Sequence, residues 1–213
     1  MQVVIAGGHG KIAMLLHPLL GERGDSVRAL IRNPDQADDV RAAGAEPVYC
    51  DLEAESDISA AVGEADAVVF AAGAGPGSGE KRKRTMDRDG AVKLIDAAKA
   101  NGISRYVIVS SIGAGSAPAE GGDVFGEYLR AKAAADQALA GSGLDFTIVR
   151  PGSLTDDEPI GTVNAAETVE RGQIPRADVA AVIAEVLHTD STIGKTFELV
   201  SGTTPIDEAL AAL

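Results

Sequence analysis

The chain predicts a doubly wound α/β fold, in which helices cover both faces of a parallel sheet. Apolar runs of about five residues alternate with longer Ala-rich segments of helical period along the 213 residues. The first run leads directly into a glycine-rich turn, and no repeat or linker interrupts the alternation. We therefore expect a single domain over residues 1–213, with about seven strands in the order 3-2-1-4-5-6-7. The ligand crevice is expected at the carboxyl ends of the strands, where the order reverses between strands 1 and 4.

The apolar runs and helical segments place each element in turn. The expected strands are 2–6, 26–32, 46–49, 66–71, 104–110, 144–149 and 195–200. The expected helices are 10–22, 34–43, 57–62, 87–101, 124–141 and 176–188. Pro18 removes one donor inside the first helix, which predicts a local bend, while Pro175 and Asp178 suit the start of the last helix. Long irregular stretches are expected at 73–86, 112–123 and 152–174, where such loops build a substrate pocket.

Composition limits the classes of partner. The formal net charge of −13 argues against nucleic acid or an anionic membrane, because phosphate groups repel such a surface. The one cysteine, Cys50, excludes an intramolecular disulfide. Met1 leads directly into the first strand and no apolar run could span a bilayer, so we expect a cytoplasmic protein without a signal peptide. We expect a monomer or homodimer with a small-molecule substrate, and no zinc or calcium site.

The turn after the first strand has the spacing of a dinucleotide-binding loop. The sequence Gly7-Gly8-His9-Gly10-Lys11-Ile12-Ala13 lets the chain turn sharply at Gly7, approach a pyrophosphate at Gly10 and pack its helix closely at Ala13. The N–H groups of this loop and of the helix N-terminus then face the phosphates.

The residue after the second strand predicts which dinucleotide is bound. A site that prefers NAD carries Asp or Glu there against the ribose 2′-hydroxyl, whereas this chain has Arg32. A guanidinium suits a phosphate dianion, so we expect NADP(H) with NAD(H) as the weaker alternative, and help from Lys11 or His9. The alternative interpretation is a solvated arginine at a strand end.

Further residues follow strands 3 and 4. Asp51 could accept a hydrogen bond from the adenine amino group while Leu52 packs on the ring, although a helix cap or a solvated loop acid remains open. Ala71, Ala72 and Gly73 are small enough for a ribose to lie against the backbone, although small residues also end strands for packing reasons.

The fifth strand brings Ser110 and Ser111 to the edge of the crevice, and Tyr128 and Lys132 follow on a helix. Tyr and Lys at this spacing share one helix face. A lysine ammonium would hold the nicotinamide ribose and assist the phenol, while Ser111 orients a carbonyl and Tyr128 passes it a proton. The alternative is a pair of surface residues on an amphipathic helix.

Together these motifs make the chain similar to the atypical, NAD(P)-binding short-chain dehydrogenases/reductases, grouped with NmrA-like, biliverdin reductase B-like and NADH-flavin reductase-like proteins. The matching segments are residues 7–13, 30–34, 105–111, 128–132, 142–152 and 176–180. The resemblance implies that Pro151, Gly152 and Ser153 lie near the nicotinamide. The family often carries Asn in the helix after strand 4, where this chain has Asp87 and Asp89.

Several functions remain open at this point. The leading hypothesis is an NADPH-dependent oxidoreductase acting on a small carbonyl, quinone or flavin-like acceptor, with Ser111 and Tyr128 acting on the acceptor. A non-catalytic redox sensor is the rival, and a nucleotide-sugar epimerase or dehydratase is a third hypothesis, for which the region after strand 6 is short. The basic run 81–84 is interpreted as a solvated helix face or as a grip on an anionic ligand.

Overall fold

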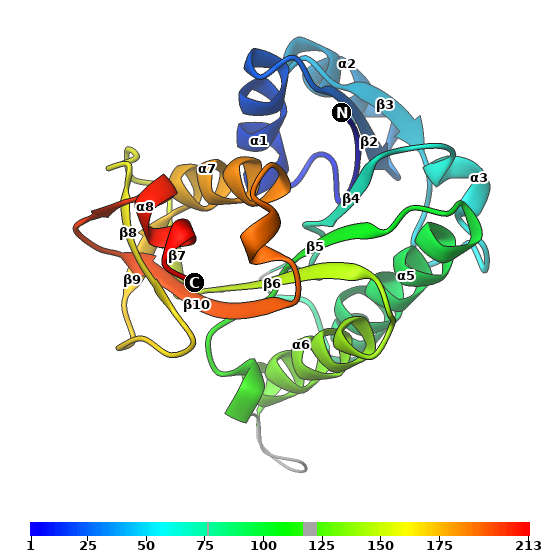
Figure 1. The fold of residues 1–213 in the computed structure, drawn as a ribbon. Coiled ribbons are helices and arrows are strands. Elements are labelled where there is room, and N and C mark those ends of the chain that lie inside the picture. Colours follow the sequence, from blue (N-terminus) through cyan, green and yellow to red (C-terminus); the bar gives the residue numbers. More distant parts are fainter. Residues whose placement is uncertain (76, 117–122) are drawn as a thin grey trace.

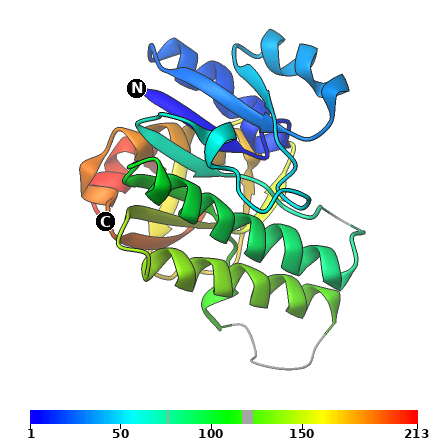
Figure 2. The same cartoon turned by 90° about the vertical axis from the view of Figure 1, so that its right-hand side faces the viewer.

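A central sheet passes through the molecule with helices on both of its faces (Figures 1 and 2). The computed structural model describes residues 1–75, 77–116 and 123–213. Within these residues nine strands form one sheet in the order β11-β8-β10-β6-β5-β4-β1-β2-β3. The strands of this sheet are β1 (Gln2–Ala6), β2 (Ser26–Ile31), β3 (Glu46–Tyr49), β4 (Ala67–Phe70), β5 (Arg105–Val109), β6 (Asp145–Pro151), β8 (Thr162–Ala166), β10 (Lys195–Ser201) and β11 (Thr204–Pro205).

The predicted strand order is confirmed. The seven predicted strands correspond to β1 to β6 and β10, and they pair in parallel in the order 3-2-1-4-5-6-10. Strands β8 and β11 extend the sheet beyond β10 with antiparallel pairing. The order reverses between β1 and β4, so the segments that follow these strands separate at the carboxyl edge and leave room for a ligand.

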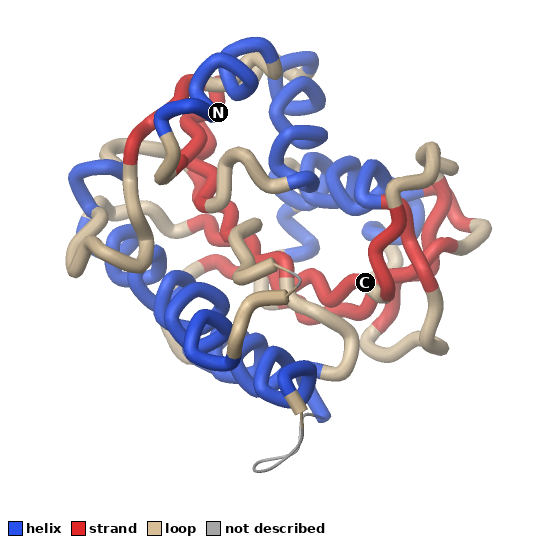
Figure 3. Tube along the Cα trace, turned by 180° about the vertical axis from the view of Figure 1, so that it is seen from behind, coloured by secondary structure: helices blue, strands red, loops and turns tan. Residues whose placement is uncertain are grey.

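The helices form two layers that the sheet separates (Figure 3). Alternate residues of β1 face opposite layers, because Val3 and Ile5 pack with α1, α2 and α7 whereas Val4 packs with α3, α5 and α6. The helical segments are α1 (Lys11–Glu22), the 3₁₀ turn Pro34–Gln36, α2 (Ala37–Ala42), α3 (Ser59–Val62), α4 (Glu80–Arg82), the π-helix η2 (Lys83–Gly90), α5 (Ala91–Ala100), the 3₁₀ turn Ala114–Ser116, α6 (Val124–Ala140), α7 (Arg176–Leu187), the 3₁₀ turn Asp190–Thr192 and α8 (Ile206–Ala211).

Two stretches that were expected to be irregular contain regular structure. Helix α4 and η2 begin at Glu80 rather than at residue 87, and their first turns carry charged side chains instead of an apolar stripe, so periodicity does not reveal them. Residues 152–174 contribute β7 (Ser153–Thr155), β8 and the start of β9 (Gln173–Pro175), and β7 and β9 form a separate two-stranded parallel sheet. In β8 only Val163 is fully buried, which leaves little hydrophobic alternation to read.

Other expectations concern helix ends and the remaining loops. Helix α1 runs through Pro18 to Glu22, and the expected local bend there stays a prediction. Helix α8 was not predicted from the sequence. Residue 76 of the loop 73–86 and residues 117–122 of the loop 112–123 lie outside the described residues. In the part of the chain that is described, the helices are too short or too polar to cross a membrane.

Asp178 connects α7 to the segment between β7 and β8. Its side chain is buried, and its two carboxylate oxygens accept hydrogen bonds from the backbone N–H groups of Ile160 and Gly161 at 3.0 and 2.9 Å. The acidic residue expected in the first turn of this helix is therefore used to fix a neighbouring loop.

We predict that Asp178→Ala lowers the free energy of unfolding by about 2–4 kcal/mol, because two backbone donors lose a charged acceptor. Chemical denaturation measures this loss. Asp157→Ala, which removes an exposed carboxylate from the same segment, is the matched control and should change stability by less than about 0.5 kcal/mol. Equal effects of the two substitutions would contradict the prediction.

Candidate functional site

The glycine loop after β1 lies in very close contact with two neighbouring strands. Gly7 has a φ of +83°, and a Cβ atom there would lie 2.6 Å from Ala72 Cα. A Cβ on Gly8 would lie 2.5 Å from Ala29 Cβ. A Cβ on Gly10 would lie 3.0 Å from the Gly7 carbonyl oxygen, so any side chain there crowds the loop. The cradle therefore depends on bare backbone, which is what close approach to a pyrophosphate requires.

His17 supports this loop from inside the protein. The side chain is fully buried, and Nε2 lies 2.7 Å from the Gly8 carbonyl oxygen, so Nε2 carries the proton and donates it. Nδ1 has no hydrogen-bond partner among the described residues. Burial lowers the pKa of His17, because its charged form would lose hydration. A residue to which the sequence assigned no role thus holds the back of the loop.

A first pocket opens in front of the glycine loop. Its walls come from the carboxyl ends of β1 to β4 and from α4. The predicted residues that line it are Gly7, Gly8, His9, Gly10, Arg32, Leu52, Ala71, Ala72 and Gly73. Cys50 also lines it, but burial raises the pKa of this thiol to about 12, so it is not a nucleophile.

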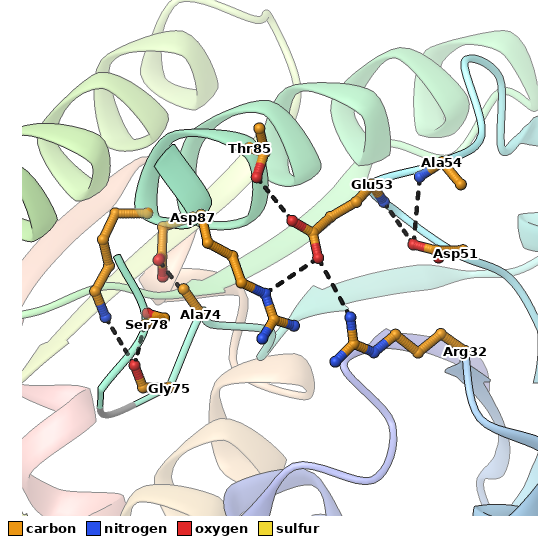
Figure 4. A network of polar contacts seen from close by, with 11 residues as sticks. Arg32, Asp51, Glu53, Ala54, Ala74, Gly75, Ser78, Thr85 and Asp87 are labelled. Carbon is orange, nitrogen blue, oxygen red and sulfur yellow. Dashed lines mark hydrogen bonds and ion pairs between the residues drawn. The ribbon is translucent and has the colours of Figure 1, made fainter. Parts of the chain in front are cut away.

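Arg32 and Arg82 both reach this pocket, and one carboxylate joins them (Figure 4). Arg32 Nη1 donates to Glu53 Oε2 at 3.3 Å, and Arg82 Nε donates to the same oxygen at 3.2 Å. Thr85 Oγ1 donates to the other oxygen, Oε1, at 2.7 Å. The first pocket is therefore lined by two guanidinium groups that share one carboxylate partner.

Three of the predicted site residues, Asp51, Lys11 and His9, have partners within the protein. Asp51 Oδ1 accepts hydrogen bonds from the N–H groups of Glu53 and Ala54, which is the geometry of the capping alternative considered for this residue. Lys11 pairs with Asp156 at 2.6 Å, and His9 pairs with Asp39 at 2.9 Å. Ile12 is buried at the start of α1.

A second pocket lies along the same sheet edge, at the carboxyl ends of β5 and β6. It brings together predicted residues from three segments, namely Ser110, Ser111, Tyr128, Pro151, Gly152 and Ser153. Phe125 lies 5.9 Å from the Tyr128 ring, centroid to centroid, and it is 58% exposed. Arg171 and Arg176 also line this pocket. The second pocket therefore combines serine and tyrosine hydroxyl groups with aromatic surface and positive charge.

The two serines differ in what they contact. Ser110 is buried and its hydroxyl donates to Asp136 Oδ2 at 2.9 Å, where Arg150 Nε also donates at 3.0 Å. Burial raises the pKa of Asp136, although both hydrogen bonds favour its charged form. Ser111 is half-buried, and its hydroxyl donates only a long hydrogen bond of 3.3 Å to the Ile112 carbonyl oxygen. Ser111 is therefore the serine with a hydroxyl available to a ligand.

Lys132 lies beneath Tyr128 rather than on the pocket wall. Its side chain is 4% exposed, and Nζ donates to the Val109 carbonyl oxygen at 3.0 Å. Nζ also forms an ion pair with Asp87 Oδ1 at 3.3 Å. The geometry of this contact is not that of a hydrogen bond, and Oδ1 has no hydrogen-bond partner among the described residues. Asp87 thus neutralises the buried lysine.

The basic run 81–84 places one side chain in the first pocket and another beside Tyr128 of the second pocket, which its sequence does not reveal. Arg82 lines the first pocket. Lys83 is buried, donates to the Gly75 carbonyl oxygen at 2.9 Å and lies 5.1 Å from the centroid of the Tyr128 ring. Lys132 Nζ lies 5.9 Å from the same centroid, so two ammonium groups lie close to the Tyr128 ring. Glu53 was missed as well, because the acid that contacts the ribose was expected after β2, and only Asp51 and Leu52 were considered after β3.

Comparison with known proteins identifies the chain as a relative of NAD(P)H-binding proteins. Residues 7–190 match the sequence profile of the family described as NAD(P)H-binding. A Bacillus subtilis (strain 168) protein, described as the uncharacterized sugar epimerase YhfK, is 40% identical over all of both chains. A Bacillus halodurans structure, provisionally described as an NAD-dependent epimerase/dehydratase, is 41% identical over all of both chains, with a TM-score of 0.94. ChuY, an anaerobillin reductase from Escherichia coli O157:H7, is 27% identical, covers 94% of this chain and 97% of its own, and has a TM-score of 0.79.

We predict that His17 makes stability depend on pH. Because the folded-state pKa is lowered, the unfolded chain takes up a proton near pH 6.5 before the folded protein does. The free energy of unfolding therefore falls as the pH drops below about 6.5, by about 1.4 kcal/mol per pH unit until the folded pKa is reached.

Thermal unfolding measured between about pH 5 and 7.5 tests this, since most carboxylates titrate below that range. His17→Gln retains an amide donor for the Gly8 carbonyl but does not titrate, so it should lose this slope. Parallel pH curves for the wild type and the variant would contradict the assignment.

Proposed function

The chain belongs to the NAD(P)H-binding family of Rossmann-fold proteins related to the atypical short-chain dehydrogenases/reductases, and from this we propose that it is an NADPH-dependent oxidoreductase. We propose a small carbonyl, quinone or flavin-like molecule as its acceptor. One observation carries the proposal: the first pocket lies where the strand order reverses between β1 and β4, and the second lies along the same sheet edge at the ends of β5 and β6. The first has the backbone and charge that suit a dinucleotide, and the second has hydroxyl groups suited to an acceptor.

At the first pocket the protein would hold the cofactor with backbone and guanidinium groups. The glycine loop and the N-terminus of α1 offer N–H groups to the pyrophosphate. Ala71, Ala72 and Gly73 leave space for a ribose, and Leu52 packs against the adenine. Arg32 would bind the 2′-phosphate, a charged contact worth about 1.5–3 kcal/mol, and this supports NADP(H) over NAD(H).

At the second pocket the chain's own residues would orient and protonate the acceptor. The bound nicotinamide cofactor supplies the hydride. Ser111 would donate a hydrogen bond to the acceptor oxygen, and the Tyr128 hydroxyl would deliver the proton. Pro151, Gly152 and Ser153 would form the wall against which the acceptor lies.

Lys132 would act mainly as a positive charge beneath Tyr128. Its ammonium group is engaged by Asp87 and by the Val109 carbonyl oxygen. Binding the nicotinamide ribose, as the Tyr-x-x-x-Lys pattern implies, would require it to leave Asp87. Lys83 supplies a second charge on the same ring.

The polar lining of the second pocket supports an acceptor with an acidic group. Arg171 and Arg176 face the pocket together with Tyr128 and the exposed ring of Phe125. A flat molecule that carries a carboxylate or phosphate would match this combination of aromatic surface and positive charge.

A second candidate function is an epimerase or dehydratase that uses the cofactor transiently. The descriptions of the Bacillus subtilis and Bacillus halodurans relatives favour it. The two functions differ in cofactor balance. An oxidoreductase consumes NADPH in proportion to acceptor, whereas an epimerase returns the cofactor to its starting state and shows no net consumption.

We predict that Arg32→Ala weakens NADPH binding about tenfold to a hundredfold and changes NADH binding less than about threefold, because only NADPH carries the 2′-phosphate. Fluorescence titration with both cofactors measures this. Arg23→Ala removes an exposed arginine beyond the far end of α1 and serves as the control. Equal losses for NADPH and NADH would place the 2′-phosphate elsewhere.

We predict that Tyr128→Phe lowers kcat for a carbonyl acceptor by about 10²–10⁴ and leaves the dissociation constant of NADPH nearly unchanged. Stopped-flow absorbance at the NADPH band measures the rate. Quinones and flavins serve as an internal control, because water can supply their proton. A variant with unaltered rates on every acceptor would reduce Tyr128 to a pocket wall, and a wild type that binds NADPH but reduces no acceptor would favour a sensor.

A further inference from the structure

Glu53 links the two arginines of the first pocket and is itself held from the other side (Figure 4). Oε2 accepts from Arg32 and Arg82, and Oε1 accepts from Thr85. The Glu53 side chain is 24% exposed, whereas those of Arg32 and Arg82 are 50% and 36% exposed. The carboxylate is thus the more enclosed member of the cluster and contacts the two arginines that line the pocket.

The pairing of β2 with β3 explains how Glu53 reaches Arg32. The two strands are parallel, with Ile31 opposite Tyr49, so the segments that follow them leave the sheet at the same edge. Arg32 follows β2 directly, and Glu53 lies in the turn after β3 that Asp51 caps. Glu53 therefore brings a carboxylate from the turn after β3 to the residue that follows β2, the place where many dinucleotide sites carry an acid.

We infer that Glu53 sets the discrimination between NADPH and NADH, an inference that rests on the proposed cofactor site. A 2′-phosphate is a dianion, so it competes with the Glu53 carboxylate for both guanidinium groups and is repelled by it. A 2′-hydroxyl is a donor, and a carboxylate accepts its hydrogen bond. Glu53 therefore disfavours NADPH and favours NADH, in opposition to Arg32 and Arg82.

The two carboxylate oxygens of Glu53 have different partners, and this keeps Glu53 in place with either cofactor. Thr85 holds Oε1 at 2.7 Å, which is shorter than the contacts of 3.2 and 3.3 Å that the arginines make with Oε2. The more exposed guanidinium groups can turn toward a phosphate while Thr85 retains the carboxylate. The Glu53 carboxylate then remains near the bound ribose with either cofactor. The preference for one cofactor reflects the difference between the repulsion of the 2′-phosphate and the hydrogen bond to the 2′-hydroxyl.

Glu53→Gln tests the inference, because it preserves the side-chain shape and an acceptor for Thr85 while removing the charge. The dissociation constant of NADPH should fall about tenfold, and that of NADH should stay equal or rise up to about threefold. Fluorescence titration with each cofactor measures both constants. Glu64→Gln is the matched control, because it removes the same charge from an exposed residue just before β4, at the opposite edge of the sheet.

Arg82→Gln provides a second variant, expected to weaken NADPH about threefold to tenfold without affecting NADH. Opposite shifts for the two cofactors support the inference, because a merely structural role of Glu53 would weaken both alike. A ratio of NADPH to NADH affinity that is the same in Glu53→Gln and Glu64→Gln overturns the inference while leaving the proposed function intact. A wild type that binds neither cofactor overturns both.

Discussion

The close approach of backbone at the end of β1 is the constraint on which the rest of the site depends. Gly7 turns with a positive φ directly against Ala72, and Gly8 lies against Ala29. Because the loop touches β4 on one side and β2 on the other, the ends of three strands are fixed relative to one another. The first pocket, the position of Arg32 and the start of α1 all follow from that contact, and His17 fixes it from within.

Ion pairs with carboxylates are a feature that basic side chains near both pockets share. In a chain with a formal charge of −13, several basic side chains at or beside the two pockets pair with individual carboxylates. Glu53 joins Arg32 and Arg82, Asp156 joins Lys11 and Arg176, and Asp39 pairs with His9. These pairs are partly exposed, so each is worth little to stability. Their main effect is to keep positive charge positioned where a phosphate or carboxylate ligand can exchange for the internal one.

The sequence predicted the strand order and the glycine loop because both depend on local patterns. Buried parallel strands appear as apolar runs, and the loop has fixed glycine spacing. The sequence did not reveal β7 to β9, whose few buried residues depend on pairing with distant strands. Nor did it reveal that Glu53 meets Arg32, or that Lys132 is buried against Asp87, because these contacts depend on which segments share a sheet edge. Side-chain partners across the fold were thus the least predictable part.

The burial of Cys50 has a practical consequence for following this protein in solution. The chain has one cysteine, the residue is 4% exposed, and its pKa of about 12 leaves a thiolate fraction on the order of 10⁻⁵ at neutral pH. Maleimide and iodoacetamide reagents react with thiolate, so Cys50 in the folded protein should react with them very slowly. A cysteine introduced at any exposed position would therefore be labelled selectively, which allows a single fluorophore or spin probe to be attached without altering the native residue in the first pocket.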